Sequence, residues 1–490
     1  MDNRHNGKSN IFANFSWAFA ERIMAQIVSF VVSIILARLL APEDYGVIAM
    51  VSVFTGISSA LALTGFGSSL IQKKEASDVD FSSTLYFSFG VICVVYLILF
   101  FLAPYLSVWT GYEGLTPYIR AMSLTLVASS IITVQNAYVM RQMKFRLLFL
   151  TSVCATGLSA CVGIFMALRG YGAWALVGQC LTKSAADVIV ISLLSGWRPR
   201  LVFSMDSIRT VYGFGWKIAV SSVTDALYRQ LRSLVIGVKY TSADLAFYDK
   251  GNQFPSLLIT NVDSTIANVL MPILSRMQED RQAVKDTVRK AIQISSTVLF
   301  PALIGLAVCG ESVITLILTE KWLPCVPYLR CLCIALMIKP LQTANFQGLL
   351  AIGRSDVYLR VQMAQKTVGV FVILVTALLF DSVLLIAAGE IVAYVIFELI
   401  NIRPNRVYLN YTFSEHIADF LPQLLVALVM GGAVFLIGTL RGPGFFTLVL
   451  QVAIGAAVYI ALSAILRLPP FLFLLRFLLQ KRKKPEDQHD

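Results

Sequence analysis

The stretch FSSTLYFSFGVICVVYLILFFLAP, residues 81–104, is apolar along most of its length and contains no charged side chain. About 20 apolar residues in an α-helix cross the hydrocarbon core of a bilayer, so this segment predicts a membrane span. Comparable stretches recur along the chain, separated by short polar loops. We predict about fourteen spans, near residues 14–38, 46–70, 81–104, 118–140, 147–168, 172–195, 210–236, 254–275, 291–318, 326–352, 361–380, 383–402, 418–440 and 444–467.

The composition agrees with a lipid environment. Of the 490 residues, 57% are hydrophobic and 14% are charged, whereas soluble domains carry about 25% charged residues. In lipid, every backbone N–H and C=O group must be hydrogen-bonded within a helix or a closed barrel. The apolar segments lack the alternation that is typical of barrel strands. The sequence therefore predicts an all-α polytopic membrane protein, with no cleavable signal peptide before the first span.

The basic residues indicate how the chain is oriented. The formal net charge is +12, but the charges lie in short loops between apolar spans, so nucleic acid is not an expected partner. Loops on one side of the predicted membrane carry most of the Lys and Arg residues, and this side is expected to be cytoplasmic. Both termini then face the cytoplasm. The tail, residues 469–490, contains the basic cluster Lys481–Lys484 and predicts an interfacial helix.

An internal repeat divides the chain. NFSWAFAERI (14–23) resembles YGFGWKIAVSS (212–222), and LLAPEDYGVIA (39–49) resembles KYTSADLAFYD (239–249), both at an offset of about 200 residues. Six spans separate the copies, which is typical of transporters built from two parallel six-helix lobes. The predicted organisation is an N-terminal lobe at 1–209, a C-terminal lobe at 210–410, two additional helices at 411–468 and the tail at 469–490.

Span 7 carries the richest set of charges at membrane depth. Lys217, Asp225, Tyr228, Arg229 and Arg232 fall within about 120° of arc on one helix face. Ionisable residues inside a membrane usually face the bundle interior or a wet cavity. One aspartate neutralises only one of three cations, so the face keeps a surplus of positive charge that favours an anionic substrate.

Other spans contribute polar faces. Span 1 carries Glu21, Arg22 and Gln26, and span 8 carries Asn261 and Asn268. Arg22 would extend the cationic face, and the remaining side chains would line the same cavity.

Two acidic residues on span 12, Glu390 and Glu398, lie on one helix face. The pattern leaves two roles open for them: pairing with buried cations, or acting as an ion-coupling proton site. Lys183 and Asp187 on span 6, by contrast, are favoured as a structural ion pair because they are four residues apart.

No catalytic pattern is present in the sequence. The three histidines, His5, His416 and His489, are interpreted as lying in tails or loops, which argues against Ser/His/Asp catalysis within the bundle. No P-loop or H-E-x-x-H motif occurs. The eight cysteines form no C-x-x-C pair and are interpreted as small core residues. We expect no enzyme activity, no metal site and no cofactor.

Four segments resemble the polysaccharide transporter family, the Wzx-type flippases of the multidrug/oligosaccharidyl-lipid/polysaccharide exporter superfamily. They are ILARLLAPEDYGVIAM (35–50), GFGSSLIQKK (65–74), FPALIGLAV (300–308) and LTEKWLPCVPYLRCLCI (318–334). Their order and spacing agree with the family over nearly the whole chain. The pattern is most similar to the branch that includes the colanic acid and teichuronic acid exporters.

The resemblance implies an alternating-access flippase with a central cationic cavity. Its cargo would be an undecaprenyl-diphosphate-linked oligosaccharide repeat unit, moved from the cytoplasmic to the periplasmic leaflet of a bacterial inner membrane. The product would be an exopolysaccharide, a lipopolysaccharide O-antigen or a capsule, with polysaccharide polymerase machinery as a partner. Coupling to H⁺ or Na⁺ would supply energy, because no nucleotide site is present.

Two further implications concern particular segments. In related lipid II flippases an adjacent pair of opposite charges in span 1 matters, and Glu21–Arg22 lies at the matching place with the order of acid and base reversed. The two extra helices of such flippases form a groove for the lipid tail, which would explain why residues 411–468 lie outside the repeat.

Two other functions compete with this interpretation. A cation-coupled multidrug exporter of the same superfamily is the alternative, but its cationic substrates would favour surplus acid in the cavity. A membrane-bound polymerase is disfavoured because no large outer loop with catalytic residues is present in the sequence.

Overall fold

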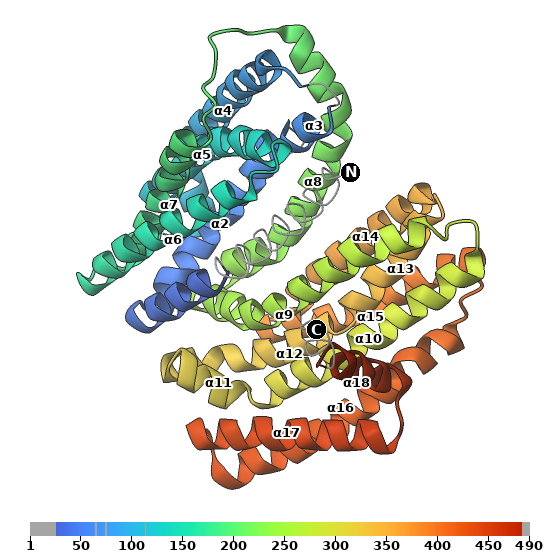
Figure 1. Cartoon of the computed structure of the whole chain (residues 1–490). Coiled ribbons are helices and arrows are strands. Elements are labelled where there is room, and N and C mark those ends of the chain that lie inside the picture. Colours follow the sequence, from blue (N-terminus) through green and yellow to red (C-terminus); the bar gives the residue numbers. More distant parts are fainter. Residues whose placement is uncertain (1–25, 64–65, 74–75, 113, 483–490) are drawn as a thin grey trace, which may run out of the picture. The chain divides into compact units, whose positions relative to one another are not determined.

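The computed structural model describes residues 26–63, 66–73, 76–112 and 114–482 (Figure 1). Among these residues the secondary structure is helical, with no β-strand. Glu21 and Arg22 of the predicted site lie outside the described ranges. Twelve helices within them are long and apolar enough to cross a membrane, which confirms an all-α polytopic membrane protein.

The first part of the chain forms eight helices in the described ranges. They are Gln26–Leu39, α2 (Pro42–Leu63), α3 (Phe66–Gln72), α4 (Asp78–Thr110), α5 (Leu115–Arg141), α6 (Phe145–Leu168), α7 (Ala173–Leu194) and α8 (Met205–Lys239). α8, the predicted span 7, is not among the twelve apolar helices. Its charged residues lower its hydropathy, although its 35 residues would extend about 50 Å.

The rest of the chain begins with α9. Its elements are α9 (Ser242–Ser275), α10 (Arg281–Val308), α11 (Gly310–Ile317), the 3₁₀ helix η1 (Glu320–Cys325), α12 (Val326–Leu336), α13 (Lys339–Ala351), α14 (Ser355–Leu379), α15 (Val383–Leu409), α16 (Phe413–Arg441), α17 (Phe445–Ile465) and α18 (Pro469–Arg482). Within the described residues, each of the fourteen predicted spans therefore coincides with one or more helices.

Two predicted spans are interrupted at residues that the structure describes. The segment predicted as 291–318 starts earlier, at Arg281, and is divided between α10 and α11. The segment predicted as 326–352 is divided between α12 and α13, two residues before Pro340. Proline has no backbone N–H, so the helical hydrogen bond back to Leu336 cannot form there.

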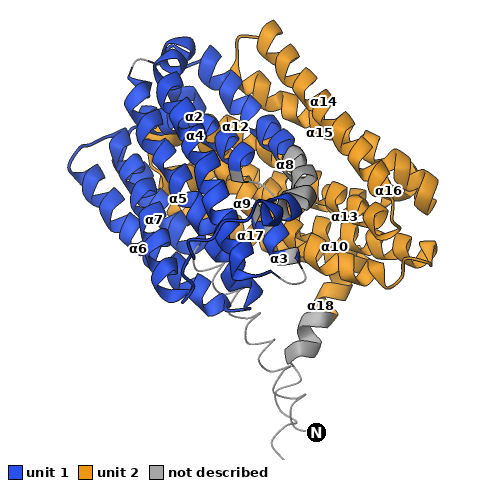
Figure 2. Ribbon diagram, turned by 90° about the horizontal axis from the view of Figure 1, so that it is seen from above, with its two compact units in different colours: residues 1–246 blue, residues 247–490 orange. Residues whose placement is uncertain are grey.

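The chain packs as two compact units, residues 1–246 and 247–490 (Figure 2). In unit 1, α6 packs on α7, α4 packs on α5, and α8 packs on α2 and α4. In unit 2, α10 packs on α12, α13 and α16, and α15 packs on α12 and α14. The lobe boundaries predicted from the repeat, 1–209 and 210–410, describe internal symmetry rather than packing, and they remain a prediction.

The helix starts of α2 and α9 support the repeat offset locally. The Asp44 carboxylate accepts a hydrogen bond from the backbone N–H of Ala41 at 3.1 Å. The Asp244 carboxylate accepts one from Thr241 in the same way at 3.2 Å. Each aspartate thus reaches back three residues to satisfy an otherwise unpaired donor, as in a capping box.

Candidate functional site

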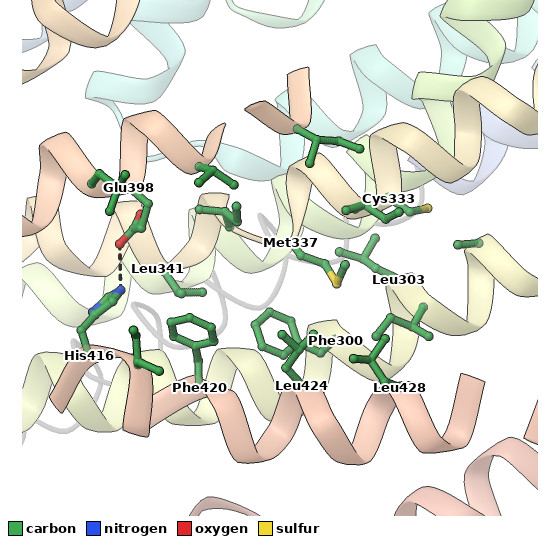
Figure 3. Close-up of a pocket in the computed structure, with 18 of the residues that line it drawn as sticks. Phe300, Leu303, Cys333, Met337, Leu341, Glu398, His416, Phe420, Leu424 and Leu428 are labelled. Atoms are coloured by element: carbon green, nitrogen blue, oxygen red, sulfur yellow. Dashed lines mark ion pairs between the residues drawn. The ribbon is translucent and has the colours of Figure 1, made fainter. Parts of the chain in front are cut away.

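An apolar pocket of about 600 Å³ lies within unit 2. Its walls come from α10, α12, α13, α15 and α16, and Figure 3 shows many of the side chains that line it. Most of them are aliphatic or aromatic, including Phe300, Leu303, Met337, Leu341, Phe420 and Leu424. Pockets for small molecules typically occupy about 300–1,000 Å³. The pocket is therefore large enough to bind a substantial apolar group.

The rim of the pocket exposes further apolar side chains. Val395 and Leu399 on α15 are 45% and 47% exposed, and Leu428 on α16 is 52% exposed. These three residues belong to helices that are long and apolar enough to span a membrane. The pocket is thus bordered by side chains that suit contact with lipid hydrocarbon rather than water.

One wall of the pocket carries a polar pair, Glu398 on α15 and His416 on α16. The His416 Nε2 atom lies 2.8 Å from the Glu398 Oε1 atom, as the dashed line in Figure 3 indicates. The Asn345 side chain on α13 donates a hydrogen bond to the same oxygen at 3.2 Å. His416 is completely buried and Glu398 is 8% exposed. Three helices thus meet at a titratable pair inside an apolar wall.

The structure corrects the sequence interpretation of His416. We interpreted this histidine as part of a loop, but α16 begins at Phe413 and includes it. The helix starts early because Thr412 and Glu415 form a reciprocal capping box. The sequence signal was present, since Thr412-x-x-Glu415 followed by an apolar run is a helix-start pattern.

A second polar cluster holds α16 against α10. The Asp419 carboxylate accepts two hydrogen bonds from Arg289, at 2.7 and 3.0 Å, and one from Gln293 at 2.6 Å. The Tyr411 hydroxyl donates to the same carboxylate at 2.7 Å. Burial and this carboxylate raise the pKa of the Tyr411 phenol far above its usual range, so the hydroxyl stays protonated as a donor. Sequence reasoning missed Asp419.

The predicted cationic face of span 7 lies on α8 in unit 1. Arg229 is exposed, and Asp225, Tyr228 and Arg232 are partly buried. Lys217 lies on the same helix, with its side chain outside the described structure. Gln26 begins the described part of the first span and is partly buried.

The predicted polar residues of span 8 lie on α9 in unit 2. Asn261 and Asn268 are both exposed, and the Asn261 amide donates to the Leu257 carbonyl at 2.8 Å. Sequence reasoning missed a charge pair between this helix and α13, in which Asp263 lies 3.6 Å from the Lys339 ammonium group. Because the α8 and α9 residues belong to separate units, a shared cavity remains a prediction.

The two acidic residues predicted on span 12 have different partners. Glu390 accepts a hydrogen bond from the Tyr248 hydroxyl, whereas Glu398 contacts His416 and Asn345. Glu398 therefore has a histidine partner, and its place in the pocket wall distinguishes it from Glu390.

Known proteins resemble the chain in sequence and in fold. It is 24% identical to the succinoglycan biosynthesis transport protein ExoT of Rhizobium meliloti (strain 1021), over 63% of each chain. It is 21% identical to the lipopolysaccharide biosynthesis protein WzxC of Escherichia coli (strain K12), over 81% of this chain and 82% of that protein. The match to the first relative thus spans less than two thirds of its length.

A solved structure shares the fold. The lipid II flippase MurJ in an inward closed conformation matches with a TM-score of 0.73 and 15% sequence identity, covering 92% of this chain and 98% of that one. The family model described as "Polysaccharide biosynthesis protein" matches residues 35–327. This range is more than half of the chain and agrees with the resemblance seen in the sequence motifs. The chain is a member of this polysaccharide biosynthesis protein family and has the helices of a multi-pass membrane protein.

Proposed function

We propose that the protein is a flippase for lipid-linked oligosaccharides. Its cargo would be an undecaprenyl-diphosphate-linked repeat unit, moved from the cytoplasmic to the periplasmic leaflet during the synthesis of a surface polysaccharide. The observation that carries the proposal is the apolar pocket in unit 2, bordered by lipid-compatible side chains. A long hydrocarbon chain is the part of such a cargo that this pocket suits.

The cargo has three chemically distinct parts, and the chain offers a suitable surface for each. The isoprenoid chain suits the pocket. The diphosphate suits the α8 cations Arg229 and Arg232, with Lys217 on the same helix, because guanidinium groups bind phosphate with paired hydrogen bonds. The saccharide suits polar side chains such as the exposed amides Asn261 and Asn268 on α9.

The names of the similar proteins support this choice of cargo. Two of them denote transport or biosynthesis of a bacterial polysaccharide, and the fold is that of a protein named as a lipid II flippase. An apolar chain combined with a charged, hydrophilic head group is therefore the substrate class that best fits both the pocket and the relatives.

The remaining features of the proposal follow from the sequence. The protein would lie in the bacterial inner membrane with both termini in the cytoplasm, consistent with the loop charges. Two lobes would alternate access to the two leaflets, driven by an H⁺ or Na⁺ gradient, because the sequence has no nucleotide-binding motif. A polysaccharide polymerase would receive the product.

The pocket can be tested by filling it. Leu424 lies in the pocket wall on α16, so Leu424→Trp should exclude the lipid chain and lower polymer export by at least about tenfold, the loss expected for roughly 1.4 kcal/mol of binding. The measurement is surface polysaccharide in a deletion strain carrying the variant, together with accumulation of the lipid-linked intermediate.

Val429 on the same helix provides a matched control. Its side chain is 58% exposed and does not line the pocket, so Val429→Trp should leave export unchanged. Membrane levels of both variants should equal that of the original protein. Normal export by a stably inserted Leu424→Trp protein would contradict the assignment of the pocket to the lipid chain.

A further inference from the structure

We infer that Glu398 and His416 form a proton-binding site in the wall of the apolar pocket, and that this site takes up one proton when a lipid chain fills the pocket. The inference rests on the proposed function, because it assigns a coupled proton to the same lipid site. It selects one of the two acidic residues on α15 and gives it a partner that the sequence did not indicate.

The unsatisfied atoms of the pair are the first argument. The His416 and Glu398 side chains lie 2.8 Å apart, at ion-pair distance. Among the described residues, neither imidazole nitrogen has an aligned hydrogen-bond partner, and neither does Glu398 Oε2. Most buried polar side-chain atoms have such a partner, so a group left without one needs a reason. A proton that comes and goes would supply that reason.

The net charge of the Glu398–His416 pair follows from the number of protons that it has bound. With a neutral imidazole and an ionised carboxylate, the pair has a net charge of −1. One added proton makes it neutral overall, either as an imidazolium–carboxylate pair or as a neutral imidazole beside a carboxylic acid. His416 Nδ1 and Glu398 Oε2 are the two available positions for that proton. An uncompensated charge is costly in apolar surroundings, so a dry pocket favours the neutral, protonated pair.

The charged side chains around the Glu398–His416 pair form ion pairs with one another. From α10, Lys285 pairs with Glu415 at 2.8 Å and Arg289 pairs with Asp419 at 2.7 Å. The Tyr411 hydroxyl, in the connection before α16, donates to Asp419.

The other elements next to the pair present few titratable groups among the described residues. On α15, Glu390 accepts from Tyr248 of α9. From α13 come the uncharged Asn345 and Gln342, and from α12 comes the buried thiol of Cys333. The net charge of the Glu398–His416 pair therefore depends mainly on whether the pair itself has bound the additional proton.

Binding of a lipid chain in the pocket would then change the affinity of the Glu398–His416 pair for a proton. An empty pocket admits water or mobile lipid, whereas a bound isoprenoid chain excludes water from the wall that contains the pair. Exclusion of water strengthens the preference for the neutral state. By linkage, protonation must in turn strengthen binding of the apolar chain by the same factor.

Isothermal titration calorimetry can count this proton. The probe is geranylgeraniol in a non-ionic detergent, since it is an isoprenoid alcohol with no titratable group. Titrations of the full-length protein in two buffers of different ionisation enthalpy, at several values between about pH 5 and 9, give the number of protons taken up per ligand bound. We expect uptake that approaches one proton, and an affinity that falls by up to about tenfold per pH unit above the midpoint.

Two isosteric variants make the assignment specific. Glu398→Gln should still bind geranylgeraniol but take up almost no proton, because a lone imidazole would have to become an uncompensated cation. Glu390→Gln is the matched control, about two turns away on the same helix and also buried, and it should behave like the original protein.

Each outcome is decisive. Binding without proton uptake, or uptake that persists in Glu398→Gln, would overturn the inference while leaving the lipid pocket intact. Failure of the unmodified protein to bind the isoprenoid would refute the pocket assignment in the proposed function, and the proton site with it.

Discussion

The polar residues of this protein have two different roles: some hold helices together, and others are exposed to a ligand. Asp419 is 3% exposed and fully engaged with Arg289, Gln293 and Tyr411, so its role is to hold α16 on α10. Arg229 on α8 is exposed and is available to a ligand. Removing an exposed charge such as that of Arg229 is expected to affect transport without affecting insertion into the membrane.

Replacing Arg229 or Arg232 with Ala tests the cationic face. Each loss would remove charge-assisted hydrogen bonds to the diphosphate, worth about 1.5–3 kcal/mol, so export should fall by at least about tenfold. Arg209→Ala is the control, since Arg209 lies near the start of the same helix with a side chain that is 79% exposed. The assay is surface polysaccharide with quantified protein in the membrane. Normal amounts of surface polysaccharide with both variants, each present in the membrane at normal levels, would contradict the proposal of a cationic binding surface.

Residue roles were only partly predictable from the sequence. The α8 charges stand out because charge is rare inside an apolar segment. His416 and Asp419 do not stand out, because their importance depends on contacts with Glu398 and Arg289, which are distant in the sequence. Local patterns cannot report such tertiary pairings.

Helices were predicted well because hydrophobicity and length are local properties. The same local view explains the errors: the break between α12 and α13 depends on Pro340, and the early start of α16 depends on the Thr412–Glu415 capping box. Each signal involves only one or two residues inside or beside an apolar run, where span length dominates the prediction.

Helix packing in unit 1 includes a close backbone approach at Gly46. A Cβ atom at Gly46 on α2 would lie 1.8 Å from the Ser242 carbonyl oxygen, whereas one at Gly90 on α4 would meet nothing within 4 Å. Gly46→Ala must therefore push α2 away from the start of α9, at a cost of about 1–3 kcal/mol. We expect a lower thermal unfolding midpoint and a lower folded yield in detergent for Gly46→Ala.

Gly90→Ala is the matched comparison, because it adds the same methyl group to another membrane-spanning helix. It should leave the unfolding midpoint unchanged or slightly raised. Equal midpoints for the two variants would show that the contact between Gly46 and Ser242 does not constrain the fold.

The whole molecule combines an all-helical membrane fold with two chemically different surfaces. The apolar pocket belongs to unit 2 and the cationic face of α8 belongs to unit 1. In the proposed function, the pocket would bind the isoprenoid chain and the cationic face would bind the diphosphate. Composition predicts the membrane fold, but it cannot predict the pocket, since apolar residues in a membrane protein face either lipid or a cavity.

Translocation in proteoliposomes tests the central claim most directly. Purified protein is reconstituted with an undecaprenyl-diphosphate-linked oligosaccharide, and a membrane-impermeant saccharide-modifying enzyme reports how much of the lipid is accessible on the outer leaflet over time. We predict that the protected fraction becomes accessible only in vesicles containing the protein, and faster under an imposed H⁺ or Na⁺ gradient. A protected fraction that stays constant with and without the protein, under every gradient, would contradict the account.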